Sequence, residues 1–272
     1  ALQDLGKAIS LEPKFVEAYM DRGGIYRSQK KFTEAIADFS KAAELAGKPA
    51  GAYFERAATY AVMKDYANAV TDYTKAIELL PNWVDAYNAR GIAYVNLKQN
   101  DSALQDFNKA LELAPKAELV YVNRAVLYRS MQQYDSALAD YTKVLQLEPE
   151  AVNVYVERGF TYHALKKEAE ALQDFSKAVE LQPNNAELYN IRAMAYHAQS
   201  KDTEALADCA KAIELNNKNA VYYGNRAVIY EQQGQKEKAI ADYTAGIKLA
   251  PKSVALYYRR GYLYKQMGKE AE

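Results

Sequence analysis

Residues 84–117 read VDAYNARGIAYVNLKQNDSALQDFNKALELAPKA, and residues 152–185 read VNVYVERGFTYHALKKEAEALQDFSKAVELQPNN. The two stretches carry the same residue types at the same places, and the pattern recurs along the chain without an insertion. Its period is 34 residues, and we number the places within it as slots, with Val16 in slot one. Complete repeats then begin at Val16, Ala50, Val84, Glu118, Val152, Ala186 and Ala220. Self-similarity at a fixed period of this length is typical of repeat architectures.

Each repeat contains two stretches with helical periodicity. Apolar and small residues follow one another at spacings of three and four, first around Tyr87 to Tyr94 and again around Ala103 to Leu111. The polar stretch 98–102 separates them, and its Asn and Asp are expected to cap the second helix. Pro115 follows the last apolar residue. The sequence therefore predicts one helix–turn–helix hairpin per repeat and an all-α fold.

Small residues and tyrosines recur at fixed slots. Slot eight is Gly or Ala and slot twenty is Ala in every repeat, so the two helix backbones are expected to approach closely there. Tyr at slots four and eleven accounts for sixteen of the 24 tyrosines. We expect these rings to fill the space around the helix crossing.

The pattern Tyr-x-x-Arg-Gly/Ala-x-x-Tyr, followed by Ala-x-x-x-Phe/Tyr and a closing Pro, resembles the tetratricopeptide repeat family over the whole chain. Slot four holds Tyr where the family usually has Trp, and slot seven holds Arg where it usually has Leu. The resemblance implies antiparallel helix pairs stacked into a right-handed superhelical solenoid, with the first helices lining a concave groove. Such a solenoid has no single core, because each repeat is stabilised by its neighbours.

We expect one solenoid over residues 1–272. It would comprise a partial repeat at 1–15, seven complete repeats over 16–253 and a second partial repeat at 254–272. Neither end carries the polar cap that a solenoid needs, so we expect these residues to be a fragment of a longer protein. The uncovered apolar surface of the terminal helices predicts possible end-to-end self-association.

Every repeat long enough to hold them carries Arg at slot seven and Asp at slot twenty-three. A ladder of anion-binding arginines is one interpretation. We favour structural ion pairs, because a half-buried Arg needs a carboxylate to offset its desolvation. Pairing within a repeat, such as Arg90 with Asp106, is predicted over the alternative between repeats, Asp106 with Arg124.

The amino-acid composition limits the classes of function that the chain can have. Lys and Arg number 35, as do Asp and Glu, so the formal charge is zero and argues against a nucleic-acid binder. The sequence contains no run of 18 apolar residues that would predict a membrane span. The single cysteine, Cys209, excludes an internal disulfide and is expected to be a buried packing residue. The compartment stays open, with the cytoplasm as the default.

The sequence shows no catalytic, cofactor or metal motif. It holds no nucleophile–base arrangement and no glycine-rich phosphate loop, and we predict that the chain is not an enzyme. His163 and His197 occupy the same slot of adjacent repeats, where equivalent helices lie on the order of 10 Å apart. That distance is too long for two imidazoles to share a metal ion.

The predicted function is a non-catalytic protein–protein interaction scaffold that binds a peptide or protein segment. The alternative is the recognition arm of a larger enzyme or signalling protein; an RNA-binding helical repeat fits the neutral charge poorly. The Lys and Asn clamp that co-chaperones of the family use for acidic C-terminal peptides is absent, because slot nine holds no Asn. We place the partner site at slots two, five, six, nine, twelve and thirteen of the first helices. The candidate residues are Asn88, Asn123, Arg129, Asn153, Phe160, His163, Asn190, His197 and Asn225.

Overall fold

The computed structural model describes residues 1–269, and these fold into sixteen α-helices with no strand. The predicted all-α class with paired helices is confirmed. The predicted C-terminal partial repeat runs to residue 272, and its last three residues lie outside the described part. Within residues 1–269 no helix is both long enough and apolar enough to cross a bilayer.

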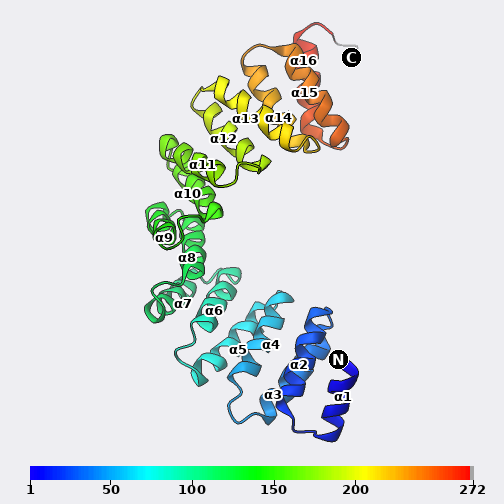
Figure 1. The fold of residues 1–272 in the computed structure, drawn as a ribbon, viewed down its shortest axis with the longest axis vertical. Coiled ribbons are helices and arrows are strands. Elements are labelled where there is room, and N and C mark those ends of the chain that lie inside the picture. Colours follow the sequence, from blue (N-terminus) through cyan, green and yellow to red (C-terminus); the bar gives the residue numbers. More distant parts are fainter. Residues whose placement is uncertain (270–272) are drawn as a thin grey trace. The chain divides into compact units, whose positions relative to one another are not determined.

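The chain divides into two compact units. Unit 1, Ala1–Gln133, holds eight helices, each packed against the next (Figure 1). Their bounds are α1 Leu2–Leu11, α2 Val16–Ser28, α3 Phe32–Leu45, α4 Ala50–Val62, α5 Tyr66–Leu79, α6 Val84–Asn96, α7 Asn100–Leu113 and α8 Glu118–Ser130.

Unit 2 begins at Tyr134 and repeats the same arrangement. Its helices are α9 Tyr134–Leu147, α10 Val152–Ala164, α11 Glu168–Leu181, α12 Ala186–Ala198, α13 Asp202–Leu215, α14 Ala220–Gln232, α15 Lys236–Leu249 and α16 Val254–Gln266. Even-numbered helices are the first helices of the repeats and odd-numbered ones the second. One continuous solenoid over both units stays a prediction.

Backbone hydrogen bonds, and not side chains, close most of the hairpin turns. Lys98, in slot fifteen, has φ of 60°, and the next N–H, that of Gln99, donates to the carbonyl of Tyr94 at 2.9 Å. This left-handed turn ends α6 and leads directly into α7, whose N-cap Gln99 makes no side-chain capping bond. The expected Asn and Asp cap of α7 was therefore wrong. Asp65 does cap α5, by accepting from the Asn68 N–H at 3.3 Å.

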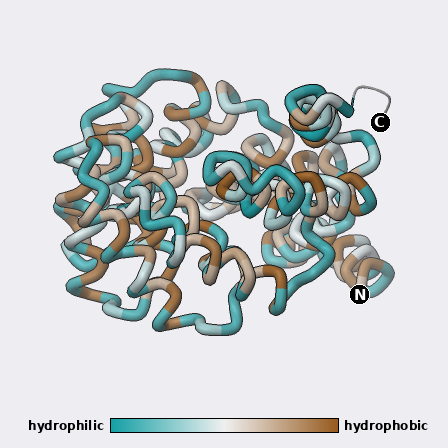
Figure 2. The backbone as a smooth tube through the Cα atoms, turned by 90° about the horizontal axis from the view of Figure 1, so that it is seen from above, coloured by the Kyte–Doolittle hydropathy of each residue, from teal (hydrophilic) through white to brown (hydrophobic). Residues whose placement is uncertain are grey.

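Slots three, eight and ten of the first helices and slots twenty, twenty-four and twenty-seven of the second helices form the interior. Slot twenty is completely buried in every repeat from Ala35 to Ala239, as expected for a close helix crossing. The tyrosines of slots four and eleven differ from the prediction, because most of them are only half-buried. Figure 2 shows apolar and polar segments alternating along the whole chain, so that the interior is distributed over the repeats.

Candidate functional site

The Arg–Asp ladder consists of bidentate ion pairs within single repeats. Arg90 donates through Nε and Nη2 to the two carboxylate oxygens of Asp106 at 2.8 and 2.7 Å. The same geometry recurs in five more repeats, in the pairs Arg22–Asp38, Arg56–Asp72, Arg158–Asp174, Arg192–Asp208 and Arg226–Asp242. Pairing within the repeat is confirmed for all six. The arginines are therefore occupied and form no anion-binding ladder.

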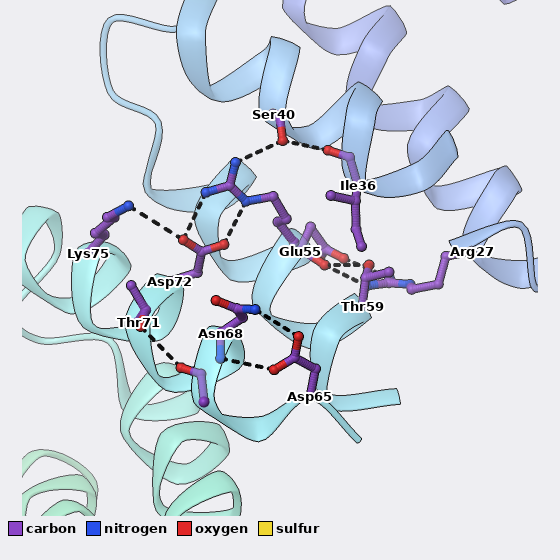
Figure 3. Close-up of polar contacts among 12 residues, drawn as sticks. Arg27, Ile36, Ser40, Glu55, Thr59, Asp65, Asn68, Thr71, Asp72 and Lys75 are labelled. Atoms are coloured by element: carbon purple, nitrogen blue, oxygen red, sulfur yellow. Dashed lines mark hydrogen bonds and ion pairs between the residues drawn. The ribbon is translucent and has the colours of Figure 1, made fainter. Parts of the chain in front are cut away.

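Several of these arginines also donate a hydrogen bond to the second helix of the preceding repeat. Arg56 Nη1 donates to the Ser40 hydroxyl at 2.8 Å, and Figure 3 labels both of its polar partners, Ser40 and Asp72. Arg90 bonds Thr74 in the same way at 3.0 Å. The guanidinium thus joins two helices of its own repeat to the second helix of the repeat before it.

Tyrosine rings flank the guanidiniums, two of them in most repeats and one at Arg56 and Arg226. In α10 the Arg158 guanidinium carbon lies 5.7 and 5.9 Å from the ring centroids of Tyr155 and Tyr162. The hydrogen bond to Asp174 raises the pKa of Arg158 above its ordinary value, although burial acts in the opposite direction. This side of the first helices therefore carries the ion pairs, although a cavity of about 550 Å³ also lies here beside Arg158. The slots predicted to bind a partner are on the opposite side.

On that opposite side, three cavities lie between successive first helices. One of about 400 Å³ separates α2 from α4 in unit 1 and is lined by Met20, Gly24 and Glu55, among others. In unit 2 a cavity of about 520 Å³ lies between α10 and α12, and another of about 360 Å³ lies between α14 and α16. The first helices therefore leave hollows at the slots predicted to face a partner.

The four asparagines of slots five and six form two equivalent pairs. Asn123 Nδ2 donates to Asn88 Oδ1 at 2.9 Å in unit 1, and Asn225 Nδ2 donates to Asn190 Oδ1 at 2.8 Å in unit 2. Asn88 and Asn190 are only 9% and 6% exposed, whereas Asn123 and Asn225 are half-buried. Each pair bridges neighbouring first helices and leaves one amide nitrogen and one amide oxygen outside that bond.

The remaining predicted residues differ in exposure. On α10, Asn153 and His163 are exposed and Phe160 is 42% exposed, with its ring edge-on to Phe175 at a centroid distance of 5.2 Å. His197 on α12 is mostly buried and contacts Asp202 through Nδ1 at 2.7 Å.

His163 contacts Glu168 in the same way as His197 contacts Asp202, at 2.8 Å. Arg129 lies near the end of α8 and is half-buried. No group of three or more metal-ligating side chains that could hold an ion occurs among residues 1–269.

Family models match nearly the whole chain. Models of the tetratricopeptide repeat match residues 1–52, 50–82, 84–117, 119–150, 152–185, 175–207 and 209–241, and a TPR repeat model matches residues 229–268. The chain belongs to the tetratricopeptide repeat (TPR) family. A search among curated proteins found no significant match.

Solved TPR structures share the fold at low sequence identity. The C-terminal part of a TPR repeat-containing protein from Cytophaga hutchinsonii is 21% identical, with a TM-score of 0.74; the match covers 88% of this chain and 98% of that one. A TPR protein from Parabacteroides merdae is 19% identical, with a TM-score of 0.65 and coverage of 91% and 98%. YrrB, described as a TPR protein with an unusual peptide-binding site, is 24% identical, with a TM-score of 0.57 and coverage of 74% and 100%.

Sequence reasoning named Phe160 at slot nine of the TPR first helices but missed the apolar residues that other repeats carry there. This slot faces solvent, yet it holds Ile92 on α6, Val126 on α8 and Phe160 on α10, all of them exposed. The signal was present in the sequence, because every repeat carries Gly or an apolar residue at slot nine: Gly24, Ala58, Ile92, Val126, Phe160, Met194, Val228 and Tyr262. Exposed apolar side chains at one slot of successive first helices, such as Ile92 and Val126 within unit 1, are typical of an interaction surface.

Charged pairs on the same face also escaped sequence reasoning. Arg27 on α2 bonds Glu55 on α4 at 2.6 Å, as Figure 3 shows for unit 1. In unit 2 the signs are reversed, because Glu231 on α14 accepts from Arg259 on α16 at 3.3 Å. In unit 1 the cation of the pair thus lies on the earlier first helix, and in unit 2 it lies on the later one.

Cys209 is a buried packing residue on α13, as predicted. Burial raises the pKa of its thiol to about 12, so the nucleophilic thiolate is scarce at neutral pH. We expect Ellman's reagent at pH 8 to react with the native chain at least ~100-fold more slowly than with the urea-unfolded chain. Equal rates in the two states would show that the thiol is accessible in the folded protein.

Proposed function

We propose that the chain is a non-catalytic protein-interaction scaffold that binds a peptide or protein segment along the exposed face of its first helices. The observation that carries the proposal is the set of cavities between successive first helices, on the side opposite the Arg–Asp ladder. The exposed apolar residues of slot nine lie on the same side. The description of YrrB as a peptide-binding TPR protein supports a peptide as the ligand.

The asparagine pairs suit the main chain of such a segment. In the Asn88–Asn123 pair the amide nitrogen of Asn88 and the amide oxygen of Asn123 stay outside the mutual bond. A peptide group presents the complementary acceptor and donor, so the pair can hold an extended segment with little regard to its side chains. The pair Asn190–Asn225 would serve unit 2 in the same manner. The exposed Asn153 and His163 extend this polar surface along α10.

The test removes the apolar residues and leaves the buried asparagines intact. Peptides are selected on the whole chain from a phage-displayed library of random twelve-residue sequences, and their affinities are measured by fluorescence anisotropy. We expect the combined substitution Ile92→Ala, Val126→Ala and Phe160→Ala to weaken binding at least tenfold, about 1.4 kcal/mol.

The matched control uses three exposed apolar residues of slot thirty, at the ends of second helices. The combined substitution Leu11→Ala, Leu79→Ala and Leu249→Ala removes comparable apolar surface away from the cavities. It is expected to leave affinity within a factor of two, with both variants retaining wild-type helix content. Equal losses in the two variants would contradict a site on the first helices.

A further inference from the structure

The cavity between α14 and α16 differs in chemistry from the rest of the first-helix face. It encloses about 360 Å³, near the lower end of the ~300–1,000 Å³ that ligand pockets occupy. Most of its wall is apolar, from Val221, Gly224 and Val228 on α14 and Leu256 on α16, and Arg259 stands beside them. A cavity of this size, with an apolar wall and one neighbouring cation, fits a single apolar side chain and an anion better than it fits a helix or strand of a partner.

Gly224 lines the cavity, and Gly246 makes room for the Leu256 side chain that forms part of its wall. Slot five holds Gly224 here, where the other first helices carry a side chain: Met20, Phe54, Asn88, Val122, Val156, Asn190 and Tyr258. Gly246 replaces the Ala or Val that slot twenty-seven holds in the complete repeats before it. Cβ atoms added at these glycines would lie 3.2 and 3.0 Å from the Leu256 side chain. Since glycine weakens a helix interior, Gly224 at a slot that carries a side chain in the other first helices favours a purpose for the cavity that it lines.

The stretch of chain that forms α16 and its flanking turns is basic. From residue 247 to 269 the chain carries six cations and no Asp or Glu, although the whole chain is neutral: Lys248, Lys252, Arg259, Arg260, Lys265 and Lys269. Glu231, the carboxylate that contacts Arg259, also accepts a hydrogen bond from the Tyr243 hydroxyl at 2.7 Å; its bond from Arg259 Nη1 is 3.3 Å long. The Arg259 guanidinium is about half-exposed and carries five N–H donors, more than its contacts with Glu231 and Tyr243 use. A carboxylate beside the cavity would therefore be attracted.

We propose that this cavity receives one apolar side chain of a bound partner peptide, of Leu, Met or Phe size, whose neighbouring Asp or Glu pairs with Arg259. The proposal rests on the proposed function and names the chemistry of the segment that the first helices bind. Apolar burial selects the side chain, and the bidentate geometry of Arg selects the carboxylate. Specificity is thus concentrated at the C-terminal end of unit 2, while the asparagine pairs hold the main chain.

The experiment uses the phage-displayed random twelve-residue library on the whole chain and then synthetic versions of the enriched peptides. We expect enriched sequences to place Leu, Ile, Met or Phe next to Asp or Glu. Gly224→Met, which fills the cavity, is expected to weaken these peptides at least tenfold. The control Gly47→Met, in the turn between α3 and α4 where a Cβ would meet nothing within 4 Å, is expected to change affinity less than twofold.

Two further measurements do not depend on the folding of the Gly224 variant. Replacing the apolar peptide residue by Ala is expected to weaken binding to the wild-type chain tenfold. Arg259→Gln is expected to weaken the acidic peptide tenfold, but not the peptide in which Asn replaces its Asp. An acidic peptide that binds Arg259→Gln as tightly as wild type would overturn the role of Arg259.

The remaining outcomes separate this inference from the proposed function. Peptides that bind tightly, keep their affinity for Gly224→Met and lose it in the slot-nine triple variant would overturn the cavity and leave the scaffold intact. A chain that enriches no peptide would overturn both. Sedimentation that shows self-association abolished by Gly224→Met would make a second copy the occupant and would also overturn the proposal.

Discussion

Asp106→Ala is expected to lower the free energy of unfolding by about 3 kcal/mol. The Asp106 side chain is 6% exposed and that of Arg90 15%, so the substitution leaves a guanidinium largely buried without its carboxylate. Breaking a buried pair costs ~3–5 kcal/mol, and the partial exposure of Arg90 places the effect at the lower end. The measurement is urea unfolding followed by circular dichroism, with the thermal midpoint as a second readout.

The control for this prediction lies on the same helix. Glu112 pairs with Lys109 at 2.9 Å on the exposed side of α7, and Glu112→Ala is expected to cost at most ~0.5 kcal/mol. The double variant Arg90→Met, Asp106→Ala should recover part of the loss, because it removes the unpaired charge. An unchanged midpoint for Asp106→Ala alone would mean that the pair is too hydrated to support the repeat.

The fold and the ion pairs could be predicted because they depend on one repeat. Helical periodicity within 34 residues specifies the hairpin, and residues sixteen apart, such as Arg90 and Asp106, face each other across it. Covariation is unnecessary for this inference, since both residues recur in every repeat long enough to hold them. The desolvation of the guanidinium decides that a carboxylate must lie beside it.

Features that depend on the next repeat could not be predicted. Slot five lies at the margin between solvent and the neighbouring first helix, so the stacking of repeats decides whether Asn88 is open or covered. In the structure Asn123 of the next first helix covers it and accounts for its burial. The residue pattern of a single repeat carries no information on how the next repeat is rotated when it stacks. The cavity beside Gly224 is hidden for the same reason, because its second wall comes from α16.

Gly159→Ala is expected to destabilise the chain by about 1–2 kcal/mol, although Ala is the better helix former. A Cβ on Gly159 would lie 2.5 Å from Cε1 of Phe175, whose ring is buried between the two helices. Overpacking of this kind costs ~1–3 kcal/mol, against which the helix propensity of Ala returns ~0.8–1.0 kcal/mol. Thermal unfolding by circular dichroism measures the difference.

Gly24→Ala is the matched control, because Gly24 also lies within a first helix but a Cβ there would meet nothing within 4 Å. It should raise stability by ~0.5–1 kcal/mol, and a loss like that of Gly159→Ala would remove the steric explanation. The repeats themselves favour that explanation, because slot eight is Gly wherever slot twenty-four is Phe and Ala where slot twenty-four is Tyr or Cys.

Since Phe160 rests edge-on against Phe175, a displaced Phe175 ring would also disturb the exposed face proposed to bind a partner. Gly159→Ala should therefore lower both the stability of the chain and its affinity for a peptide at α10. Gly91→Ala in unit 1 should lower the stability and leave the affinity at α10 unchanged.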